Sequence, residues 1–186
     1  MNESTIKAQL MDAQDLDRTL NRIARQIVED IDEPADLGRL ALVGMQTRGV
    51  YLARRLRDKI QDAEGVELPV GILDPTMYRD DLRTHLRPPV VRITDIPFAV
   101  DGRRIVLVDD VLYTGRTARA ALDALTDIGR PADVRFVVII DRGRRELPLS
   151  ASIIGRDVPT TAGEEVRVRL SEIDDREGVW LVSVSE

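Results

Sequence analysis

Two adjacent carboxylates, Asp109 and Asp110, are the side chains of this sequence best placed for chemistry. They follow residues 105–108, four apolar and mostly β-branched residues that are typical of a strand buried on both faces of a parallel sheet. Open α/β proteins bind their ligands beyond the carboxyl ends of such strands. We therefore predict that the acidic pair faces a ligand; the alternative is an ordinary strand and helix in which the pair only caps a turn.

The residues after the acidic pair form a short hydroxylated loop that leads into a predicted helix. The loop contains Thr114, Gly115 and Thr117, and apolar residues then recur at helical spacing until Gly129 and Pro131. Backbone N–H groups at a helix start bind phosphate, hydroxyl groups add donors, and glycine allows a close approach. Because carboxylates repel phosphate, we expect the acidic pair to face another part of the same ligand, such as a sugar diol bridged by a divalent cation.

A family resemblance follows from this stretch and extends along most of the chain. Residues 108–117 read Val-Asp-Asp-Val-Leu-Tyr-Thr-Gly-Arg-Thr, which resembles the phosphoribosyl pyrophosphate (PRPP) motif of the type I phosphoribosyltransferases. This residue pattern is most similar to that of the family members that also regulate pyrimidine operons. Residues 42–53 resemble the family's second loop, residues 78–82 its mobile loop, and residues 141–160 its base-side segments. The Walker and dinucleotide-binding patterns, which mark competing phosphate-binding folds, do not occur in the sequence.

The resemblance implies a fold and a role for each part of the site. The fold is α/β, with a central, mostly parallel sheet flanked by helices and a small C-terminal hood of short strands. Asp109, Asp110 and Arg79 are the implied catalytic residues, with Mg²⁺ bound alongside PRPP near the acidic pair. The implied contacts are Val111, Leu112, Tyr113, Thr114, Gly115, Arg116 and Thr117 for the 5′-phosphate, Thr47, Arg48, Gly49 and Arg79 for pyrophosphate, and Asp141, Ile153, Ile154, Val158 and Thr160 for the base.

Two functions follow from the resemblance. The first is the reaction of uracil with PRPP to give UMP and pyrophosphate. The second is binding of a pyrimidine (pyr) operon leader mRNA in the presence of a uridine nucleotide, which regulates transcription by attenuation. The implied RNA-binding residues are Asn21, Arg25, Arg142, Arg144, Arg145 and Arg156, with Arg22 beside them. The chain departs from these relatives at Asn21, Arg25 and Arg144, where they tend to have threonine or histidine. A phosphoribosyltransferase for another base, without the RNA role, is the alternative.

Composition limits the class of protein. The 186 residues are 43% hydrophobic, which is enough for one domain with a substantial core. Cysteine is absent from the sequence, so disulfides and thiolate chemistry are excluded. We see no signal peptide and no apolar run long enough for a membrane span, and therefore expect a cytoplasmic protein. The net charge of −6 disfavours a globally basic nucleic-acid binder but allows a local basic face. The family further implies a homodimer or homotetramer.

The elements that must position these residues can be placed along the chain. Residues 11–31 are predicted as a helix with Asp12 as its N-cap, and residues 39–43, 66–73 and 133–140 as buried strands. We expect one domain over residues 1–186, with a core at about 10–148 and a hood at about 149–186. Residues 74–97 lack periodicity and are rich in proline, which favours a mobile lid that excludes water; His85 is predicted to be a solvated residue of this lid.

Overall fold

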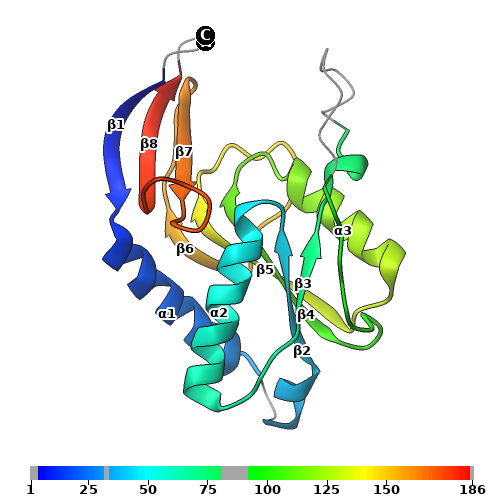
Figure 1. Cartoon of the computed structure of the whole chain (residues 1–186). Coiled ribbons are helices and arrows are strands. Elements are labelled where there is room, and N and C mark those ends of the chain that lie inside the picture. Colours follow the sequence, from blue (N-terminus) through cyan, green and yellow to red (C-terminus); the bar gives the residue numbers. More distant parts are fainter. Residues whose placement is uncertain (1–3, 32–33, 81–91, 185–186) are drawn as a thin grey trace.

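A parallel sheet of five strands forms the centre of the molecule, in the computed structural model that describes residues 4–31, 34–80 and 92–184. The strand order is β3-β2-β4-β5-β6 (Figure 1). The strands are β2 (Leu40–Met45), β3 (Val70–Leu73), β4 (Arg104–Leu112), β5 (Asp133–Asp141) and β6 (Ile153–Asp157). Neighbouring strands are parallel throughout, which confirms the predicted α/β architecture.

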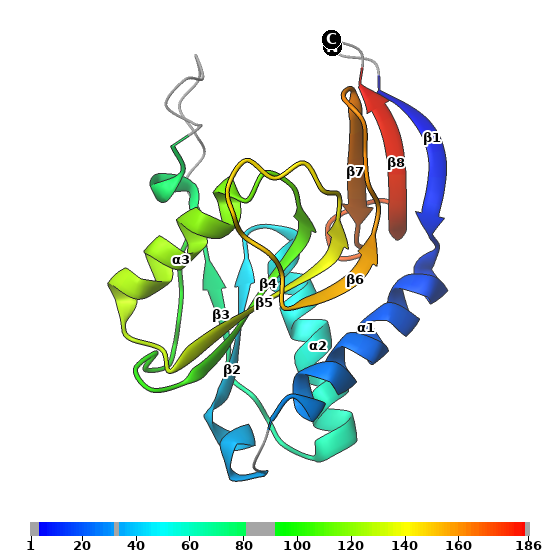
Figure 2. The ribbon, with the colours of Figure 1, turned by 180° about the vertical axis from the view of Figure 1, so that it is seen from behind.

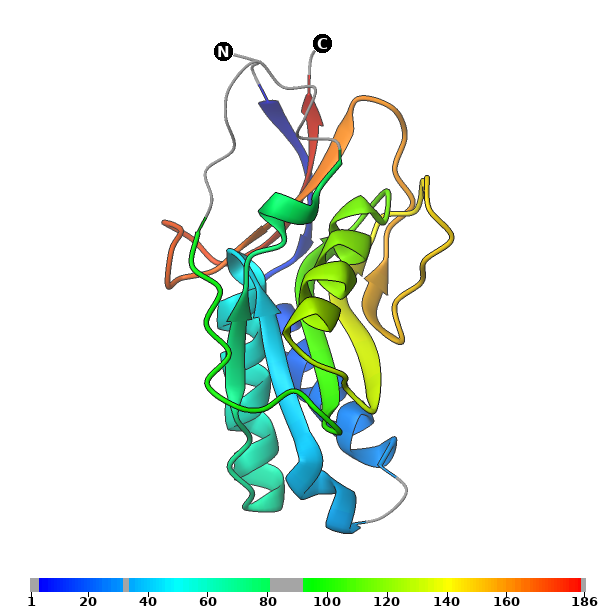
Figure 3. The ribbon, with the colours of Figure 1, turned by 90° about the vertical axis from the view of Figure 1, so that its right-hand side faces the viewer.

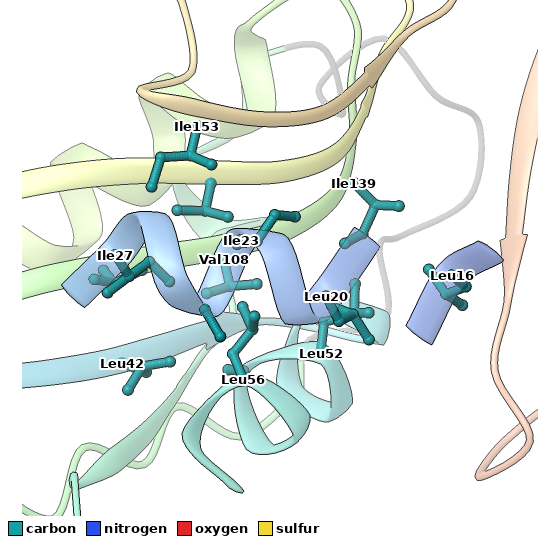
Figure 4. Close-up of a cluster of buried hydrophobic side chains, with 14 of the residues drawn as sticks. Leu16, Leu20, Ile23, Ile27, Leu42, Leu52, Leu56, Val108, Ile139 and Ile153 are labelled. Atoms are coloured by element: carbon teal, nitrogen blue, oxygen red, sulfur yellow. The ribbon is translucent and has the colours of Figure 1, made fainter. Parts of the chain in front are cut away.

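Helices cover both faces of this sheet because alternate residues of the central strands point to opposite sides. α1 (Ala13–Glu29) and α2 (Arg48–Glu64) pack on one face, where Leu42 and Val108 belong to their hydrophobic cluster (Figure 4). α3 (Arg116–Ile128) packs on the other face with Val43 and Leu107. Each central strand is thus buried on both sides, which explains its nearly continuous run of apolar residues.

The predicted helix at residues 11–31 is confirmed, together with its N-cap. Asp12 Oδ1 accepts a hydrogen bond from Asp15 N at 2.7 Å, and Asp15 Oδ2 accepts one from Asp12 N at 3.3 Å, which completes a capping box. Leu16, Leu20 and Ile23 lie one or two turns apart along α1 and are fully buried against the sheet. Helix α1 is therefore held by its apolar stripe, and its opposite face is exposed.

The hood is an antiparallel sheet of three strands in the order β1-β8-β7 (Figures 1 and 2). It consists of β1 (Ser4–Met11), β7 (Glu164–Arg169) and β8 (Gly178–Val184). β1, which the sequence analysis did not predict, pairs with β8 and leads directly into α1. Its residues mix polar and apolar types without a continuous apolar run, so its sequence carries only a weak strand signal.

One strand assigned to the hood belongs to the central sheet instead. Residues 153–157 form β6, which pairs in parallel with β5 through Ile153 beside Val137 and Ile154 beside Val138. Short apolar stretches fit either sheet, because their periodicity does not reveal the partner strand. The two sheets are thus connected by the chain between β6 and β7.

The segment predicted as a lid is described only at its two ends. Residues 81–91, with His85, lie outside the described residues, as does the end of the matched stretch 78–82. η2 (Thr76–Tyr78) lies beside α3 (Figure 3), where Tyr78 Oη donates to Asp127 Oδ2 at 2.7 Å and Arg119 Nη2 donates to Tyr78 O at 3.0 Å. The short helix η1 (Pro34–Arg39) precedes β2. Within the described parts of the chain, no helix is long and apolar enough to cross a bilayer.

Candidate active site

A cavity of about 290 Å³ opens where β4 passes into α3. Asp109 and Arg79 line it together with the whole loop at residues 111–117, and Ala118, Phe136 and Glu146 complete its wall. The structure therefore brings together, around one space, residues from two separate segments that the sequence assigned to catalysis and to the 5′-phosphate. Asp110 is not among the lining residues, although it adjoins Asp109 in β4.

The loop at residues 111–117 is held in place mainly by main-chain contacts. Gly115, the residue before α3, has a φ of 90°, a left-handed conformation that favours glycine. Thr114 O accepts hydrogen bonds from Glu146 N at 2.9 Å and from Leu147 N at 3.0 Å, so the loop is tied to the segment after β5. Because α3 begins at Arg116, its first amide groups and the positive end of its dipole lie at the cavity. This is an anion cradle made largely of backbone.

Arg116 contributes to this cradle differently from what the sequence suggested. Its Nε donates to Glu146 Oε2 at 2.6 Å and its Nη1 donates to Asp80 Oδ2 at 2.8 Å. The guanidinium thus connects Asp80, which lies after η2, with Glu146 in the segment after β5. These two carboxylates compensate much of its charge. We retain the backbone of Arg116 in the phosphate cradle and assign its side chain to holding the cavity wall.

The acidic pair is buried at the end of β4. Asp109 is 9% exposed, and its Oδ1 accepts a hydrogen bond from Asp110 N at 2.9 Å. Burial, followed by the adjacent Asp110 carboxylate, raises the pKa of Asp109 well above its usual range; burial also raises the pKa of Asp110. Arg79 beside Asp109 and Arg48 beside Asp110 act in the opposite direction. Full ionisation of the pair is therefore favoured by a further positive charge in the site.

The donor set suits Mg²⁺ bound mainly by a substrate. Carboxylate oxygens are the protein ligands that Mg²⁺ prefers, and it usually takes one or two of them together with substrate phosphates. Asp109 and Asp110 offer such oxygens beside the cavity. Among the residues described here, no group of three or more potential metal-ligating side chains exists that could form a closed protein site.

Three of the four predicted pyrophosphate residues, Thr47, Arg48 and Gly49, lie at the start of α2, whereas Arg79 lines the cavity. Gly49 packs directly on β4, because an added Cβ would lie 2.3 Å from Val108 O. Arg48 forms two hydrogen bonds with Asp174, from Nε at 3.2 Å and from Nη2 at 2.7 Å. Thr47 precedes α2 and follows a cis peptide bond from residue 46. Thr47, Arg48 and Gly49 do not line the cavity that Asp109 and Arg79 line, but Gly49 packs on β4 and the charge of Arg48 acts on Asp110.

The predicted base-side residues separate into two groups. Ile153 is only 5% exposed and packs in the core under α1, so its assignment to a base pocket is wrong. The side chain of Ile153 points from β6 to the face of the sheet that α1 covers. Ile154, the next residue, packs on the opposite face. Asp141 pairs with Arg145 and accepts a hydrogen bond from Val158 N through its carbonyl group at 2.8 Å.

Thr160, the last predicted base residue, connects with the phosphate loop through Arg142. Arg142 Nε donates to Thr160 Oγ1 at 3.1 Å, and its guanidinium stacks on the Tyr113 ring at 3.9 Å from the centroid. Arg142 is therefore 8% exposed, and burial lowers its pKa. This cation–π contact fixes the guanidinium of Arg142 relative to the Tyr113 ring. Through Arg142, Thr160 is thus joined to Tyr113, which lines the cavity.

The predicted RNA residues do not form one surface. Asn21 and Arg25 are exposed on α1, and Arg156 is exposed on β6. Arg22 Nη2 donates to Ile154 O at 3.2 Å and to Gly155 O at 2.5 Å, which joins α1 to β6. Arg144 is exposed on the separate segment after β5.

Two other arginines assigned to RNA point inward, which corrects that part of the prediction. Arg142 is buried under Tyr113, and Arg145 donates to Tyr113 O at 2.7 Å and to Leu149 O at 2.9 Å. Both side chains form contacts that hold the segment after β5 against the loop at residues 111–117. A run of arginines after a strand gives no sequence signal that distinguishes such internal contacts from an exposed basic face.

Sequence reasoning missed several residues that shape the site. Asp174 lies 126 residues from its partner Arg48, so no local pattern connects them. Asp74 is buried directly after β3, and the signal used for Asp109, a carboxylate at the end of a buried strand, would have found it. Phe136 and Glu146 line the cavity from β5 and the segment after it.

Comparison with known proteins identifies relatives of the whole chain. Residues 8–171 match the family model described as phosphoribosyl transferase domain. A protein named "Bifunctional protein PyrR" from Pelotomaculum thermopropionicum is 53% identical, covering 97% of this chain and 98% of the relative. Proteins of the same name from Roseiflexus sp. and Listeria welshimeri are 51% and 48% identical and cover 94% and 95% of this chain, which itself spans 94% and 97% of them.

Solved structures show the same fold at much lower sequence identity. A hypoxanthine phosphoribosyltransferase from Trypanosoma cruzi superimposes with a TM-score of 0.74 at 17% identity, covering 95% of each chain. A hypoxanthine-guanine phosphoribosyltransferase from Bacillus anthracis gives a TM-score of 0.70 at 17% identity, covering 99% of this chain and 100% of that one. These likenesses confirm the predicted type I phosphoribosyltransferase fold.

Proposed function

We propose that this chain is a uracil phosphoribosyltransferase. It belongs to the phosphoribosyl transferase domain family and, within that family, to the bifunctional PyrR proteins. The reaction transfers the phosphoribosyl group of PRPP to uracil and yields UMP and pyrophosphate. One observation carries the proposal: Asp109, Arg79 and the complete loop at residues 111–117 surround one cavity. A sugar phosphate with a charged leaving group matches this arrangement of carboxylates, cation and amide groups.

The reaction needs placement and electrostatics more than covalent chemistry from the protein. A bond forms between a uracil ring nitrogen and the anomeric carbon, while the bond from that carbon to pyrophosphate breaks and its electron pair leaves with the pyrophosphate. The proton of the ring nitrogen passes to the departing pyrophosphate or to solvent. Positive charge develops on the ribose ring. The carboxylates of Asp109 and Asp110 bind the ribose hydroxyls, which places their negative charge close to the ring. The amide groups that begin α3, with the hydroxyls of Thr114 and Thr117, hold the 5′-phosphate.

Cationic side chains hold the leaving pyrophosphate in this proposal. The charges of Arg48 and Arg79 act on Asp110 and Asp109, so that positive charge lies beside the acidic pair. Thr47 adds a hydroxyl group and Gly49 allows the start of α2 to approach β4. Asp109 and Asp110 would hold Mg²⁺ that arrives with PRPP, and the ion would neutralise part of the negative charge of the leaving group.

The base is proposed to lie between the phosphate loop and the segments after β5 and β6. Asp141, Ile154, Val158 and Thr160 remain the base-side residues, without Ile153. The names of the relatives favour the uracil-specific, regulatory branch over a phosphoribosyltransferase for another base. The hypoxanthine enzymes of the same fold do not bear on base choice, because at 17% identity they show the fold alone.

A second function, RNA binding, is favoured by the basic surface that α1 shares with β6. Arg18, Arg22 and Arg156 line one shallow hollow there, and Arg25 and Asn21 line the adjoining one with Arg22. We propose that pyr leader mRNA binds this surface when a uridine nucleotide occupies the active site, with Arg144 in a separate contact. Binding by arginines to phosphates makes affinity fall steeply with salt. We further propose a single domain that assembles as a homodimer or homotetramer.

Pyrophosphate release from PRPP, measured against a panel of free bases, tests the enzyme. We expect release with uracil and formation of UMP, with little release for adenine, hypoxanthine or orotate. A preference for another base would reject uracil specificity but keep the family reaction. A filter-binding assay with the leader RNA, at several salt concentrations and with or without UMP, tests regulation. Salt-sensitive binding that UMP strengthens supports it, and loss of binding in Arg25→Ala with Arg156→Ala would locate it.

A further inference from the structure

Arg92 reaches the pyrophosphate loop from the far end of the lid segment. Its Nη1 donates a hydrogen bond to Thr47 Oγ1 at 2.5 Å. Next to it, Gln46 Nε2 donates to Ile93 O at 3.5 Å. Two segments far apart in the sequence, residues 46–47 and residues 92–93, therefore run side by side at the start of α2.

A buried carboxylate holds the backbone of Arg92 in this place. Asp74 is 7% exposed and accepts a hydrogen bond from Arg92 N through Oδ2. Its Oδ1 accepts from Thr76 N at 3.0 Å, and its own N–H donates to Thr94 Oγ1 at 3.0 Å. Hydrogen bonds from backbone amides to a carboxylate are charge-assisted and therefore strong. Asp74 thus fixes Arg92 at the backbone, while its side chain extends to Thr47.

The charge of Arg92 lacks the compensation that neighbouring arginines have. Arg48 is paired with Asp174, and Arg116 is paired with Glu146. Within the described part of the chain, no carboxylate lies within ion-pair distance of the Arg92 guanidinium. A guanidinium has five N–H donors, and the bond to Thr47 uses one of them. An anion beside Thr47 would be bound by the rest.

We propose that Arg92 binds the pyrophosphate group of PRPP together with Thr47, and that Asp74 is its positioning residue. The inference rests on the proposed function, because it is this reaction that brings a pyrophosphate to Thr47. It adds a third arginine to Arg48 and Arg79. Arg48 comes from the start of α2, and Arg79 and Arg92 from the two ends of the segment 74–97, so the leaving group is surrounded by cations rather than bound by one loop.

Isothermal titration of inorganic pyrophosphate with Mg²⁺ into the full-length protein tests the contact directly. Arg92→Ala is expected to weaken pyrophosphate binding about tenfold, as loss of a hydrogen bond between charged groups does. The KM for PRPP is expected to rise by a similar factor, whereas UMP, which lacks the pyrophosphate, binds as in the wild type. Arg92→Lys, which keeps the charge, is expected to recover part of the affinity.

Arg103→Ala is the matched control, because it removes the same charge from the same stretch of chain. Arg103 Nε donates to Ala99 O at 3.0 Å, and its guanidinium lies 5.5 Å from the Phe98 ring centroid. Its substitution should leave all three ligands unchanged. Asp74→Asn is expected to raise the KM for PRPP while kcat stays near the wild-type value; equal changes in kcat and KM would reject its positioning role.

The outcomes separate this inference from the proposed function. Unchanged pyrophosphate binding in Arg92→Ala, or equal losses of pyrophosphate and UMP affinity, would overturn it. A wild-type protein that binds pyrophosphate but forms no UMP would reject the proposed reaction alone, and a tenfold loss in Arg92→Ala would then still support the contact. A wild-type protein that binds no pyrophosphate would reject both.

Discussion

The two ends of the site that we propose to bind anions lie against the same strand, β4, yet they are built in different ways. The 5′-phosphate cradle is one contiguous stretch, residues 111–117, whose main chain is tied to the segment after β5. The proposed pyrophosphate side is assembled from the side chains of Thr47 and Arg48 at the start of α2 and of Arg79 and Arg92 at the two ends of the segment 74–97. One end depends on the course of a short piece of chain, and the other on the packing of the whole domain.

This difference predicts different sensitivities to substitution. Amide groups at a helix start keep their direction whatever side chain they carry, so single changes in the cradle remove only part of its affinity. The cations opposite depend on carboxylates elsewhere: Asp174 pairs with Arg48, and Asp74 holds the backbone of Arg92. Loss of a cation or of its partner should therefore affect ligands that contain pyrophosphate and spare UMP.

The largest effect is expected at the acidic pair, where the two ends meet. Asp110→Asn should lower the turnover of PRPP and uracil by more than about tenfold, a loss of over 1.4 kcal/mol of transition-state stabilisation. The fold should persist, because the amide keeps the size of the side chain and one accepting oxygen for Val111 N. Steady-state kinetics and thermal unfolding measure the two. Asp157→Asn, an exposed carboxylate at the end of β6, is the control. Undiminished UMP formation would remove Asp110 from the mechanism.

The next effect distinguishes the pyrophosphate side from the cradle. Arg48→Ala should weaken PRPP and pyrophosphate binding about tenfold, because a charge-assisted contact is lost. UMP binding should remain unchanged, since UMP has no pyrophosphate. Titration calorimetry with each ligand measures this, and Arg57→Ala, which removes a cation from the exposed side of α2 beside Asp58, is the control. If UMP affinity fell as much as PRPP affinity, Arg48 would act through the general shape of the site.

A smaller and less selective effect is expected in the cradle. Thr114→Val keeps the size of the side chain but removes its hydroxyl, one neutral donor among several amide groups. PRPP and UMP should weaken alike, by about threefold to tenfold, because both contain the 5′-phosphate. The same titrations measure both ligands, and pyrophosphate binding serves as the internal control that stays constant. A loss confined to PRPP would place the Thr114 hydroxyl outside the 5′-phosphate contacts.

The contrast between the two ends also explains what the sequence revealed. The residues that surround the cavity, 111–117, could be singled out from the sequence, because strand, acidic pair, small loop and helix start are consecutive and each has a local signal. Thr47 and Arg48 were predicted from a similar loop. Asp174 and the inward turn of Arg142 were not predicted, because each depends on contacts with residues distant in the chain.

The hood shows the same limit at the level of strands. A hood of short strands was expected at about residues 149–186, where β7 and β8 lie, but β1 and the sheet to which β6 belongs were not predicted. A strand of mixed polarity such as β1 gains its stability from its partner β8 rather than from its own pattern. Pairing depends on residues that are distant in the chain. A single sequence therefore predicts where a strand lies more readily than which strand it pairs with.

The smallest effect is expected at a second arginine of α2, which binds the hood but not the site. Arg55 Nη1 donates to Glu177 Oε1 at 2.6 Å. This hydrogen bond outweighs burial and holds the pKa of Glu177 below its usual range. Because the folded pKa is lowered, the ionised carboxylate stabilises the fold fully above its ordinary pKa, and the contribution is lost as pH falls through the lowered value. A partly exposed ion pair contributes about 1 kcal/mol or less.

Glu177→Gln should therefore lower the free energy of unfolding by about 1 kcal/mol or less at pH 7. The difference from the wild type should shrink toward zero near pH 3, where protonation has begun to remove the charge from the wild-type carboxyl as well. Urea unfolding at both pH values measures this, and PRPP affinity should be unchanged in the variant. A stability difference that persists in acid would mean that packing, not charge, holds Arg55. A weaker PRPP affinity would show that the whole hood contact on α2, and not Asp174 alone, sets the position of Arg48.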